Sequence, residues 1–301
     1  MTPQIIFIVG PTCIGKSKLG VDLARKLNGE IINADSMQVY SNLKILTARP
    51  TLSEMKLVKH HLYGFINASI RYNVASWCND ASKIINNNKN TLIIIGGTGM
   101  YIEKLLNGLI QLPTIPENIK KESELLILKE GIDKFIDKVN NIDSESLKKI
   151  SKNDTVRLRR IWEVYKHTNY NLSYWLKNKN KKYLNNKKFA IYLFTPSRKE
   201  IYNRVNKRFV EMINKGAIDE VKKLNSLNLD KSLPIMRAHG VPEITEYLLN
   251  KCTLDECINK GQQVTRNYVK RQFTWWRSTK LSIHQNFDQF PDKIDLNLLN
   301  Y

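Results

Sequence analysis

One segment near the N-terminus restricts the possible folds of this chain more than any other feature. The continuous apolar and mostly β-branched run from Ile5 to Val9 leads directly into GPTCIGKS, residues 10–17, which matches the pattern G-x-x-x-x-G-K-[ST]. Apolar residues at helical spacing follow it, at Leu19, Leu23 and Leu27. A buried strand, a glycine-rich turn and a helix are the context in which this pattern forms a phosphate-binding loop. The sequence therefore predicts a P-loop at the end of a strand in a parallel sheet.

The residue types of this loop suit a phosphate ligand. Gly10 and Gly15 let the backbone curl so that amide groups point inward, where the start of the next helix adds partial positive charge. Lys16 supplies a cation, and the Ser17 hydroxyl suits Mg²⁺ or phosphate. The expected diphosphate- or nucleotide-binding residues are Gly10, Pro11, Thr12, Cys13, Ile14, Gly15, Lys16 and Ser17. The motif alone leaves an ATP-using kinase or ATPase as the first alternative.

Three further apolar runs indicate the rest of the sheet. They lie at Glu30 to Ala34, Thr91 to Ile95 and Phe189 to Phe194, and helical patterns follow the last two. Strands alternating with helices predict an α/β fold with a P-loop-containing, doubly wound parallel sheet. Between Pro113 and Lys188 apolar residues recur at helical spacing without a convincing strand, which predicts an all-helical insertion domain. We expect a catalytic core with C-terminal helices at residues 1–112 and 189–285, the insertion at 113–188, and a C-terminal tail at 286–301.

Composition limits the kind of partner and compartment. With 48 Lys and Arg against 28 Asp and Glu, the net charge of +20 favours a polyanion such as nucleic acid, although a general bias toward Lys, Asn and Ile explains part of it. The four cysteines form no CxxC pair, so neither a disulfide framework nor a structural metal is indicated. The chain shows no signal-peptide pattern and no run of eighteen apolar residues. We expect a cytoplasmic protein that does not span a membrane.

Polar residues at the ends of other strands are the next candidates. Asp35 follows a strand run at the edge where the P-loop lies, although it can equally cap a helix or hold Mg²⁺ through water. The stretch Gly96 to Tyr101 has no carboxylate to position an attacking water, which weakens an ATPase interpretation. Its Thr98 hydroxyl can approach a ligand, or the glycines serve packing only. Arg237, in the turn before Gly240, can grip a phosphate.

The C-terminal region is expected to be helical. Residues 197–200 and 253–256 each match the S/T-x-x-E capping-box pattern, and the second opens a helical pattern that continues to Arg277. Three basic residues of that helix fall within about 40° of one another on its surface, namely Arg266, Lys270 and Arg277. Such a stripe suits a phosphate backbone, and a solvated helix face explains it equally well.

Eight motifs in a fixed order give a family resemblance. GPTCIGKS, NADSMQVY, TARPT, KHHL, GGTGMYI, NDTVRLRRIWEVY, RAHGVPEI and KRQFTWWR together resemble the tRNA dimethylallyltransferase family over about residues 4 to 280. The resemblance implies transfer of the dimethylallyl group from dimethylallyl diphosphate to N6 of adenosine 37, in tRNAs that read codons beginning with U. The P-loop then holds a leaving diphosphate, with Mg²⁺ at Ser17 as cofactor.

The resemblance also assigns roles to residues. It implies that Asp35 accepts the proton from the adenosine amine, and that Thr98 and Arg237 help the P-loop to hold the diphosphate. It implies that the helical insertion clasps the anticodon stem-loop and that residues 265–272 contact tRNA. The expected tRNA-binding residues are Asp35, Ser36, Met37, Gln38, Val156, Arg157, Leu158, Arg159, Arg160, Arg237, Ala238, His239, Gly240, Val241, Pro242, Arg266, Lys270 and Arg271. We expect a monomer.

Three departures from the family pattern concern loop geometry. Leu46 and Lys59 stand where the family commonly has Gly and Pro, and Val241-Pro242 replaces a common Gly-Tyr. Three alternative functions stay open at this point. They are a prenyltransferase for free adenine nucleotides, a small-molecule kinase, and an RNA-binding P-loop protein without catalysis. The insertion and the net charge count against the first, because a mononucleotide needs neither.

Overall fold

The computed structural model describes residues 4–178, 180–184 and 187–299. The chain forms two compact units, which we call the core unit (residues 1–106 and 183–301) and the insertion unit (residues 107–182). The insertion unit thus spans 107–182, where we expected an insertion at 113–188. Within the described ranges, none of the helices has both the length and the apolar composition needed to cross a lipid bilayer.

A six-stranded parallel sheet forms the centre of the core unit. Its strands are β1 (Ile5–Val9), β2 (Glu30–Asn33), β3 (His60–His61), β4 (Leu92–Gly96), β5 (Phe189–Phe194) and β6 (Gln285–Phe287). They are arranged in the order β3-β2-β4-β1-β5-β6, and every neighbouring pair is parallel. The four longest correspond to the four apolar runs, and β1 at the centre is buried along its whole length. The predicted parallel α/β sheet is confirmed.

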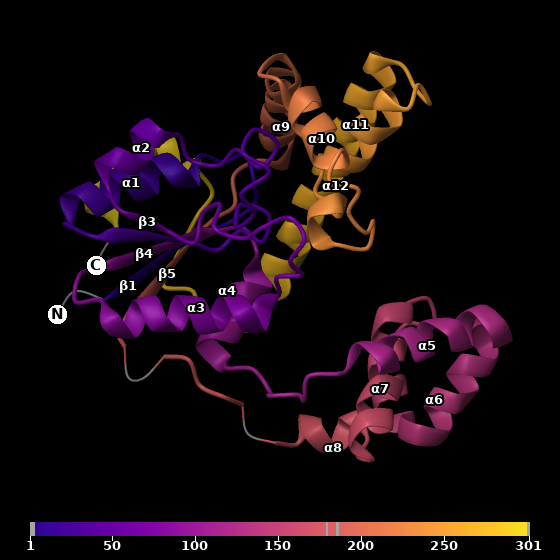
Figure 1. Ribbon diagram of the computed structural model, residues 1–301. Coiled ribbons are helices and arrows are strands. Elements are labelled where there is room, and N and C mark those ends of the chain that lie inside the picture. The colour runs from indigo at the N-terminus through magenta and orange to yellow at the C-terminus, as the bar shows by residue number, and fades with distance from the viewer. Residues whose placement is uncertain (1–3, 179, 185–186, 300–301) are drawn as a thin grey trace. The chain divides into compact units, whose positions relative to one another are not determined.

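Helices cover both faces of this sheet. Figure 1 shows α1 (Lys16–Lys26) and α3 (Val74–Asn87) on opposite faces, so the sheet is doubly wound. The other helices of this unit are α2 (Leu52–Leu57), α4 (Gly99–Asn107), α9 (Arg198–Asn214), α10 (Ala217–Asn225), α11 (Val241–Leu248) and α12 (Leu254–Ser278), with short 3-10 helices η1 (Pro234–Arg237), η2 (Pro291–Lys293) and η3 (Leu296–Leu298).

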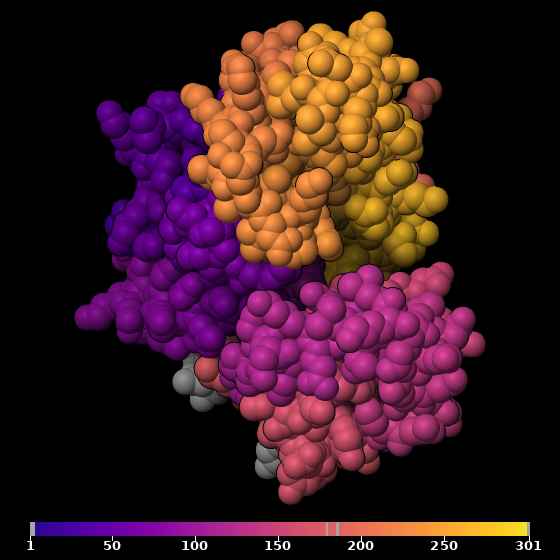
Figure 2. All heavy atoms as spheres, turned by 45° about the vertical axis from the view of Figure 1, so that its right-hand side comes forward, coloured from indigo at the N-terminus to yellow at the C-terminus, as the bar shows by residue number. Residues whose placement is uncertain are grey.

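The C-terminal helices pack against N-terminal loops. Figure 2 shows the orange residues of these helices directly against the indigo and purple N-terminal residues. Glu220 of α10 fixes this contact, because its carboxylate accepts hydrogen bonds from three successive backbone amides, those of Lys44, Ile45 and Leu46. The helices α9 and α12 also pack against each other. Segments distant in sequence therefore meet beside the carboxyl ends of the strands.

The two predicted capping boxes have different outcomes. Thr253 and Glu256 form the reciprocal pair of a capping box at the start of α12, as predicted. Ser197 is the N-cap of α9, but its side chain makes no capping hydrogen bond, so the prediction of a capping box there is wrong. At both places the pattern still marks where the helix begins, because Ser and Thr are favourable N-cap residues.

The segment expected to be a tail belongs to the core unit. Residues 285–287 form β6 beside β5, and the Phe287 ring stacks on Phe194 with centroids 4.8 Å apart. Phe290 and Leu299 are also buried. A three-residue strand followed by scattered apolar residues lacks the length that makes periodicity visible, so the sequence did not reveal this packing. Residues 300 and 301 of the expected tail lie outside the described residues.

The regular elements of the insertion unit are all helical in its described part, 107–178 and 180–182. They are α5 (Glu117–Glu130), α6 (Ile132–Leu147), α7 (Thr155–Thr168) and α8 (Leu172–Leu176). Phe135, Val139, Leu158 and Ile161 are completely buried between α6 and α7. This small core gives the unit its own hydrophobic interior.

Candidate active site

The lysine of the P-loop is bound by the backbone of the loop itself. The Lys16 ammonium donates hydrogen bonds to the carbonyl oxygens of Gly10, at 3.0 Å, and Pro11, at 2.6 Å. Burial lowers the pKa of Lys16 to about 8, and the nearby carboxylate of Asp35 opposes this shift. A carbonyl oxygen carries no formal charge. The lysine is therefore held across the loop while its positive charge stays available to an anion.

Two glycines let the loop turn back into α1. Gly10 has a φ of 142°, and a Cβ there would lie 2.2 Å from the carbonyl oxygen of Phe194. Gly15, with a φ of 93°, is the N-cap of α1 and provides no side-chain cap for the first amide groups of the helix. Free amides at a helix N-terminus, together with the helix dipole, attract negative charge. The loop thus has the shape and the donors of a phosphate site.

Asp35 is held in place by a buried asparagine. Asn33, completely buried at the end of β2, accepts a hydrogen bond from the Asp35 amide at 2.8 Å and donates to the Asp35 carbonyl at 3.0 Å. The Asp35 Oδ1 atom accepts hydrogen bonds from the amides of Met37, at 2.8 Å, and Gln38, at 3.3 Å. Its Oδ2 atom makes no hydrogen bond to the described residues. One carboxylate oxygen is therefore oriented and the other is available to a substrate.

Two neighbouring cavities lie beside the P-loop and share three lining residues. The loop cavity, of about 130 Å³, is lined by the P-loop from Thr12 to Ser17 and by Gln272. The apolar cavity, of about 170 Å³, has walls that include Leu46, Val205, Phe209, Met212 and Tyr268. Thr12, Asp35 and Arg208 line both cavities. A ligand with an anionic end and an apolar end fits this pair of cavities, with the junction of the two ends beside Asp35.

Arg208 is a site residue that we did not predict. It lies on α9 and donates a hydrogen bond to the Thr12 hydroxyl at 3.0 Å. Its positive charge is close enough to Lys16 to oppose protonation of that lysine. The sequence contains a signal for it, because Val205, Phe209 and Met212 form one apolar side of the helix and position 208 falls on that same side. A charged residue on a buried helix face often indicates a ligand.

Thr98 and Arg237 lie beside the cavities in different ways. The Thr98 hydroxyl accepts a hydrogen bond from the Ser36 amide at 3.4 Å and contacts the Tyr268 hydroxyl, but it lines neither cavity. Arg237 is exposed and lines the apolar cavity only. Burial and the charge of Asp35 raise the pKa of Tyr268, so its hydroxyl stays protonated. Of the arginines, Arg208 is the one at the P-loop.

The tRNA-binding candidates of the core unit differ in exposure. Ser36, Met37, His239 and Gln38 line one of the two cavities or the other. Lys270, Arg271 and Pro242 are exposed. Arg266 is held by Asn206 and Gln263, at 2.6 Å each. Ala238, Gly240 and Val241 are buried, although Ala238 lines the apolar cavity, and the contact with RNA that we expected for them stays a prediction.

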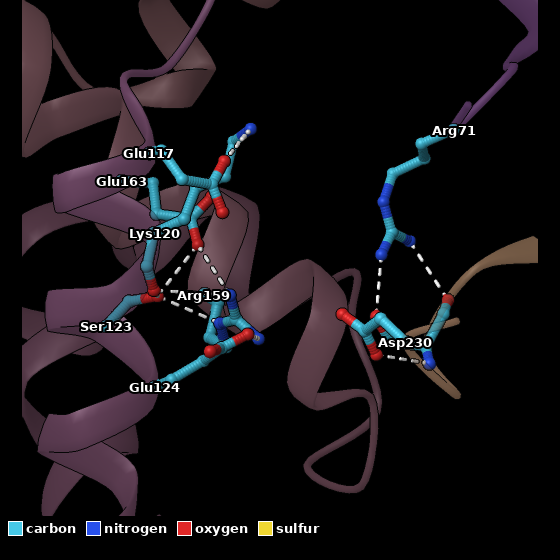
Figure 3. A network of polar contacts seen from close by, with 9 residues as sticks. Arg71, Glu117, Lys120, Ser123, Glu124, Arg159, Glu163 and Asp230 are labelled. Carbon is cyan, nitrogen blue, oxygen red and sulfur yellow. Dashed lines mark hydrogen bonds and ion pairs between the residues drawn. The ribbon is translucent and has the colours of Figure 1, made fainter. Parts of the chain in front are cut away.

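The candidates of the insertion unit lie on α7. Val156 and Arg157 are exposed. Leu158 is completely buried in the core of the unit, and the contact with RNA that we expected for it stays a prediction. Figure 3 shows the Arg159 guanidinium directed into a polar network with Ser123, Glu124 and Glu163, where its ion pair with Glu124 is 2.7 Å long. Arg160 donates to the carbonyl of Pro113 at 3.4 Å.

Oxygen ligands for a cation are present in the loop cavity. The Ser17 hydroxyl and the Asp35 carboxylate both line it. In the described ranges, no group of three or more His, Cys, Asp and Glu residues could hold a metal ion by itself. Mg²⁺ characteristically binds one or two protein oxygens and completes its coordination with water and substrate phosphates. The donors present fit an ion that arrives with a phosphorylated substrate.

A doubly wound parallel sheet whose first strand leads into this glycine-rich loop defines a P-loop fold, and here the loop lies beside a carboxylate and an apolar cavity. Residues 38–279 match the model of the IPP transferase family, and the chain belongs to this family. It is 41% identical over 282 residues to the tRNA dimethylallyltransferase of Pelagibacter ubique (strain HTCC1062), covering 93% of this chain and 90% of that protein. It is also 41% identical over 286 residues to the tRNA dimethylallyltransferase of Wolbachia sp. subsp. Drosophila simulans (strain wRi), covering 94% and 96%.

Solved structures agree with this assignment. The full-length tRNA isopentenylpyrophosphate transferase of Bacillus halodurans has a TM-score of 0.66 and 30% identity, covering 99% of this chain and 93% of that one. A eukaryotic dimethylallyltransferase acting on tRNA has a TM-score of 0.80 and 25% identity, covering 98% of this chain and 76% of that one. The similarity extends over both units of the chain.

Proposed function

We propose that this protein transfers the dimethylallyl group of dimethylallyl diphosphate to N6 of adenosine 37 in tRNAs that read codons beginning with U. The product is N6-(dimethylallyl)adenosine. Family membership supports the reaction class. The single structural observation that carries the proposal is the pair of cavities that meet at Thr12, Asp35 and Arg208. This junction suits a substrate that has a diphosphate on one side of the breaking bond and an apolar group on the other.

The chemistry follows from the groups at the junction. The nitrogen of the adenosine amine forms a bond to C1 of the dimethylallyl group while the bond from C1 to the diphosphate oxygen breaks. The electron pair of that bond leaves with the diphosphate, whose growing charge is stabilised by Lys16, Arg208 and the amides at the start of α1. The proton of the amine passes to the Asp35 Oδ2 atom, which is free to accept it.

We further propose that Mg²⁺ binds with the substrate. Ser17 is the protein ligand that we expect, and Asp35 lines the same cavity. When bound, the ion neutralises part of the diphosphate charge and so makes it a better leaving group. Lys16 and Arg208 act on the same oxygens as direct hydrogen-bond donors.

The remaining site residues are given roles that their positions support. Thr98 positions the loop that carries Asp35, through the Ser36 amide. Arg237, at the wall of the apolar cavity, binds a phosphate of the RNA. The exposed Lys270 and Arg271 contact the RNA backbone, and Arg157 does so in exchange for its exposed ion pair with Asp154, which is 3.3 Å long. The target adenosine leaves its stack to reach Asp35, as in other enzymes that modify a base. We propose that residues 107–182 hold the anticodon stem-loop, and that the protein acts in the cytoplasm as a monomer.

The decisive assay compares acceptors. The protein is incubated with Mg²⁺, dimethylallyl diphosphate and unmodified tRNA, and with AMP or ATP in parallel reactions, and the digested nucleosides are weighed by mass spectrometry. Prenylated adenosine from tRNA alone supports the proposal. Prenylated free nucleotide would replace it with a nucleotide prenyltransferase. No prenylation anywhere would leave a kinase or an RNA-binding protein.

Replacing Asp35 tests the assigned base. Among the described residues that line the two cavities, Asp35 alone carries a carboxylate, so for Asp35→Ala we expect turnover to fall by about a hundredfold to ten-thousandfold. The affinity for tRNA should stay within a few-fold, as measured by filter binding. Asp35→Asn, which keeps the shape of the side chain and can still accept the Met37 amide, is the matched variant and should be nearly as inactive. Unchanged turnover in either variant would remove Asp35 from this role.

A further inference from the structure

The side-chain amide of Gln272 connects three distant parts of the core unit. Gln272 lies on α12 and is only 4% exposed. Its Oε1 atom accepts a hydrogen bond from the Thr12 amide of the P-loop at 2.9 Å. Its Nε2 atom donates to the carbonyl of Gly97, in the turn after β4, at 3.0 Å. It also contacts the Tyr268 hydroxyl, one helical turn earlier. Both polar atoms of the amide are thus occupied inside the protein.

The partners fix the orientation of this amide. A backbone amide can only donate and a carbonyl can only accept, so the oxygen of Gln272 must face Thr12 and its nitrogen must face Gly97. The backbone leaves room for this arrangement at Gly97, where an added Cβ would lie 2.2 Å from the Gln272 Nε2 atom. A buried amide without partners is unfavourable, so the three segments are strongly held in one arrangement.

Thr12 is therefore held from two sides. Gln272 of α12 binds its amide, and Arg208 of α9 binds its hydroxyl. Because the Thr12 amide is already bound, it is not a donor for a phosphate in this arrangement. The hydrogen bond from the Thr12 amide to Gln272 instead fixes Thr12, and the loop continues from there through Cys13 to Lys16 along the loop cavity. Gln272 itself also lines that cavity.

We propose that Gln272 is a positioning residue of the diphosphate site, which keeps the P-loop and the turn after β4 in register for the leaving group. The family resemblance implied a contact with tRNA for residues 265–272, whereas Gln272 faces inward. The inference rests on the proposed function. It adds that one face of α12 serves the diphosphate, while Lys270 and Arg271 on the same helix are exposed.

Gln272→Met tests the role of the two hydrogen bonds. Methionine is of similar length and has no amide, so the Thr12 amide and the Gly97 carbonyl lose their partner. We expect the KM for dimethylallyl diphosphate, and its Kd by calorimetry, to rise by about tenfold to a hundredfold. The KM for tRNA should stay within twofold, and kcat should change less than the KM for the diphosphate.

Gln272→Glu gives a second readout, which a purely structural role would not produce. A protonated carboxyl group has one donor and one acceptor and can replace the amide, whereas a carboxylate cannot donate to the Gly97 carbonyl. The ratio of the variant's KM for dimethylallyl diphosphate to that of the wild type should therefore fall as the pH is lowered. A ratio independent of pH would contradict the proposed hydrogen bonds.

Gln262→Met is the matched control. Gln262 is partly buried on the same helix and donates to the Asn206 carbonyl of α9 at 3.1 Å, without touching either loop. Its loss should lower the melting temperature and leave the KM for dimethylallyl diphosphate unchanged. The inference is overturned if Gln272→Met behaves like this control, or if its KM values for both substrates rise equally. Wild-type protein that fails to prenylate tRNA would instead overturn the proposed function.

Discussion

Arg159 in the insertion unit and Arg208 in the core unit are both partly buried arginines, but their surroundings differ. Arg159 forms ion pairs with Glu124 and Glu163 and hydrogen bonds with Ser123 and the Lys120 carbonyl (Figure 3). Arg208 donates to the neutral hydroxyl of Thr12 and forms no ion pair with any residue that the structure describes. One arginine is neutralised and joins helices, whereas the other retains its charge beside a cavity.

Other basic residues likewise divide into paired and unpaired cations, and the core unit contains both kinds, since Arg204 pairs with Asp292 and Lys260 with Glu246. In the insertion unit, Lys138 pairs with Glu130 at 3.2 Å and Lys166 pairs with Glu122 at 3.2 Å. Within the described residues of the core unit, Lys16 forms no ion pair. The net charge of +20 is therefore a poor guide to where a polyanion binds. What matters is which cations lack a carboxylate, because a paired cation has already gained much of its electrostatic stabilisation.

The largest effect expected from this comparison is at Arg208. Arg208→Gln removes a charged donor from the diphosphate end, and kcat/KM for dimethylallyl diphosphate should fall by about a hundredfold to a thousandfold. Arg204→Gln is the matched control on the same helix, because Arg204 pairs with Asp292 at 3.3 Å and lies over the Phe290 ring. The control should stay within twofold. Equal losses in steady-state kinetics would mean that α9 as a whole, and not the charge at position 208, matters.

Arg159, whose charge is paired, should affect stability rather than activity. Arg159→Met leaves Ser123 and Glu163, both buried, without their charged partner. We expect the free energy of unfolding to fall by about 1–3 kcal/mol, measured by urea denaturation. Lys149→Met, which removes an exposed pair with Glu145, is the control and should change it by less than about 1 kcal/mol. A stability equal to the wild type would show that the network contributes little.

The lowered pKa of Lys16 predicts a pH dependence. The protonated lysine binds the diphosphate, and its pKa of about 8 in the free protein means that this form is lost as the pH rises. The Kd for dimethylallyl diphosphate should thus be flat below pH 8 and rise up to about tenfold per pH unit above it. Lys16→Arg should flatten the curve, since arginine stays charged. Calorimetry at several pH values, corrected for the titration of the ligand itself, compares the wild type with Lys16→Arg.

The smallest effect should come from the exposed cations of α12. Lys270→Gln and Arg271→Gln should each weaken tRNA binding by a few-fold and reduce the slope of log K against log salt by roughly one. Lys138→Gln, whose charge is already paired with Glu130, is the control. Equal slopes for all three variants, measured by filter binding between low and moderate salt, would contradict the distinction between free and paired cations.

Much of the fold could be predicted because its signals are contiguous in the chain. A buried strand, a glycine turn and a helix N-terminus lie within residues 5–26, so the P-loop is recognisable without any distant contact. The start of α12 is also encoded locally, by Thr253 and Glu256. The tail was misassigned because β6 is a strand only through its pairing with β5.

The sequence by itself determined the parallel sheet, the P-loop, the helical insertion and the position of Asp35 at a strand end, because neighbouring residues impose those features through periodicity and backbone preference. Only the tertiary structure decided which distant side chains complete the site. Gln272 meets Thr12 across 260 residues of chain, and Arg208 meets it across 196. Such contacts depend on how α9 and α12 pack against the carboxyl edge of the sheet. No local pattern specifies that packing, because it arises from the burial of many side chains at once.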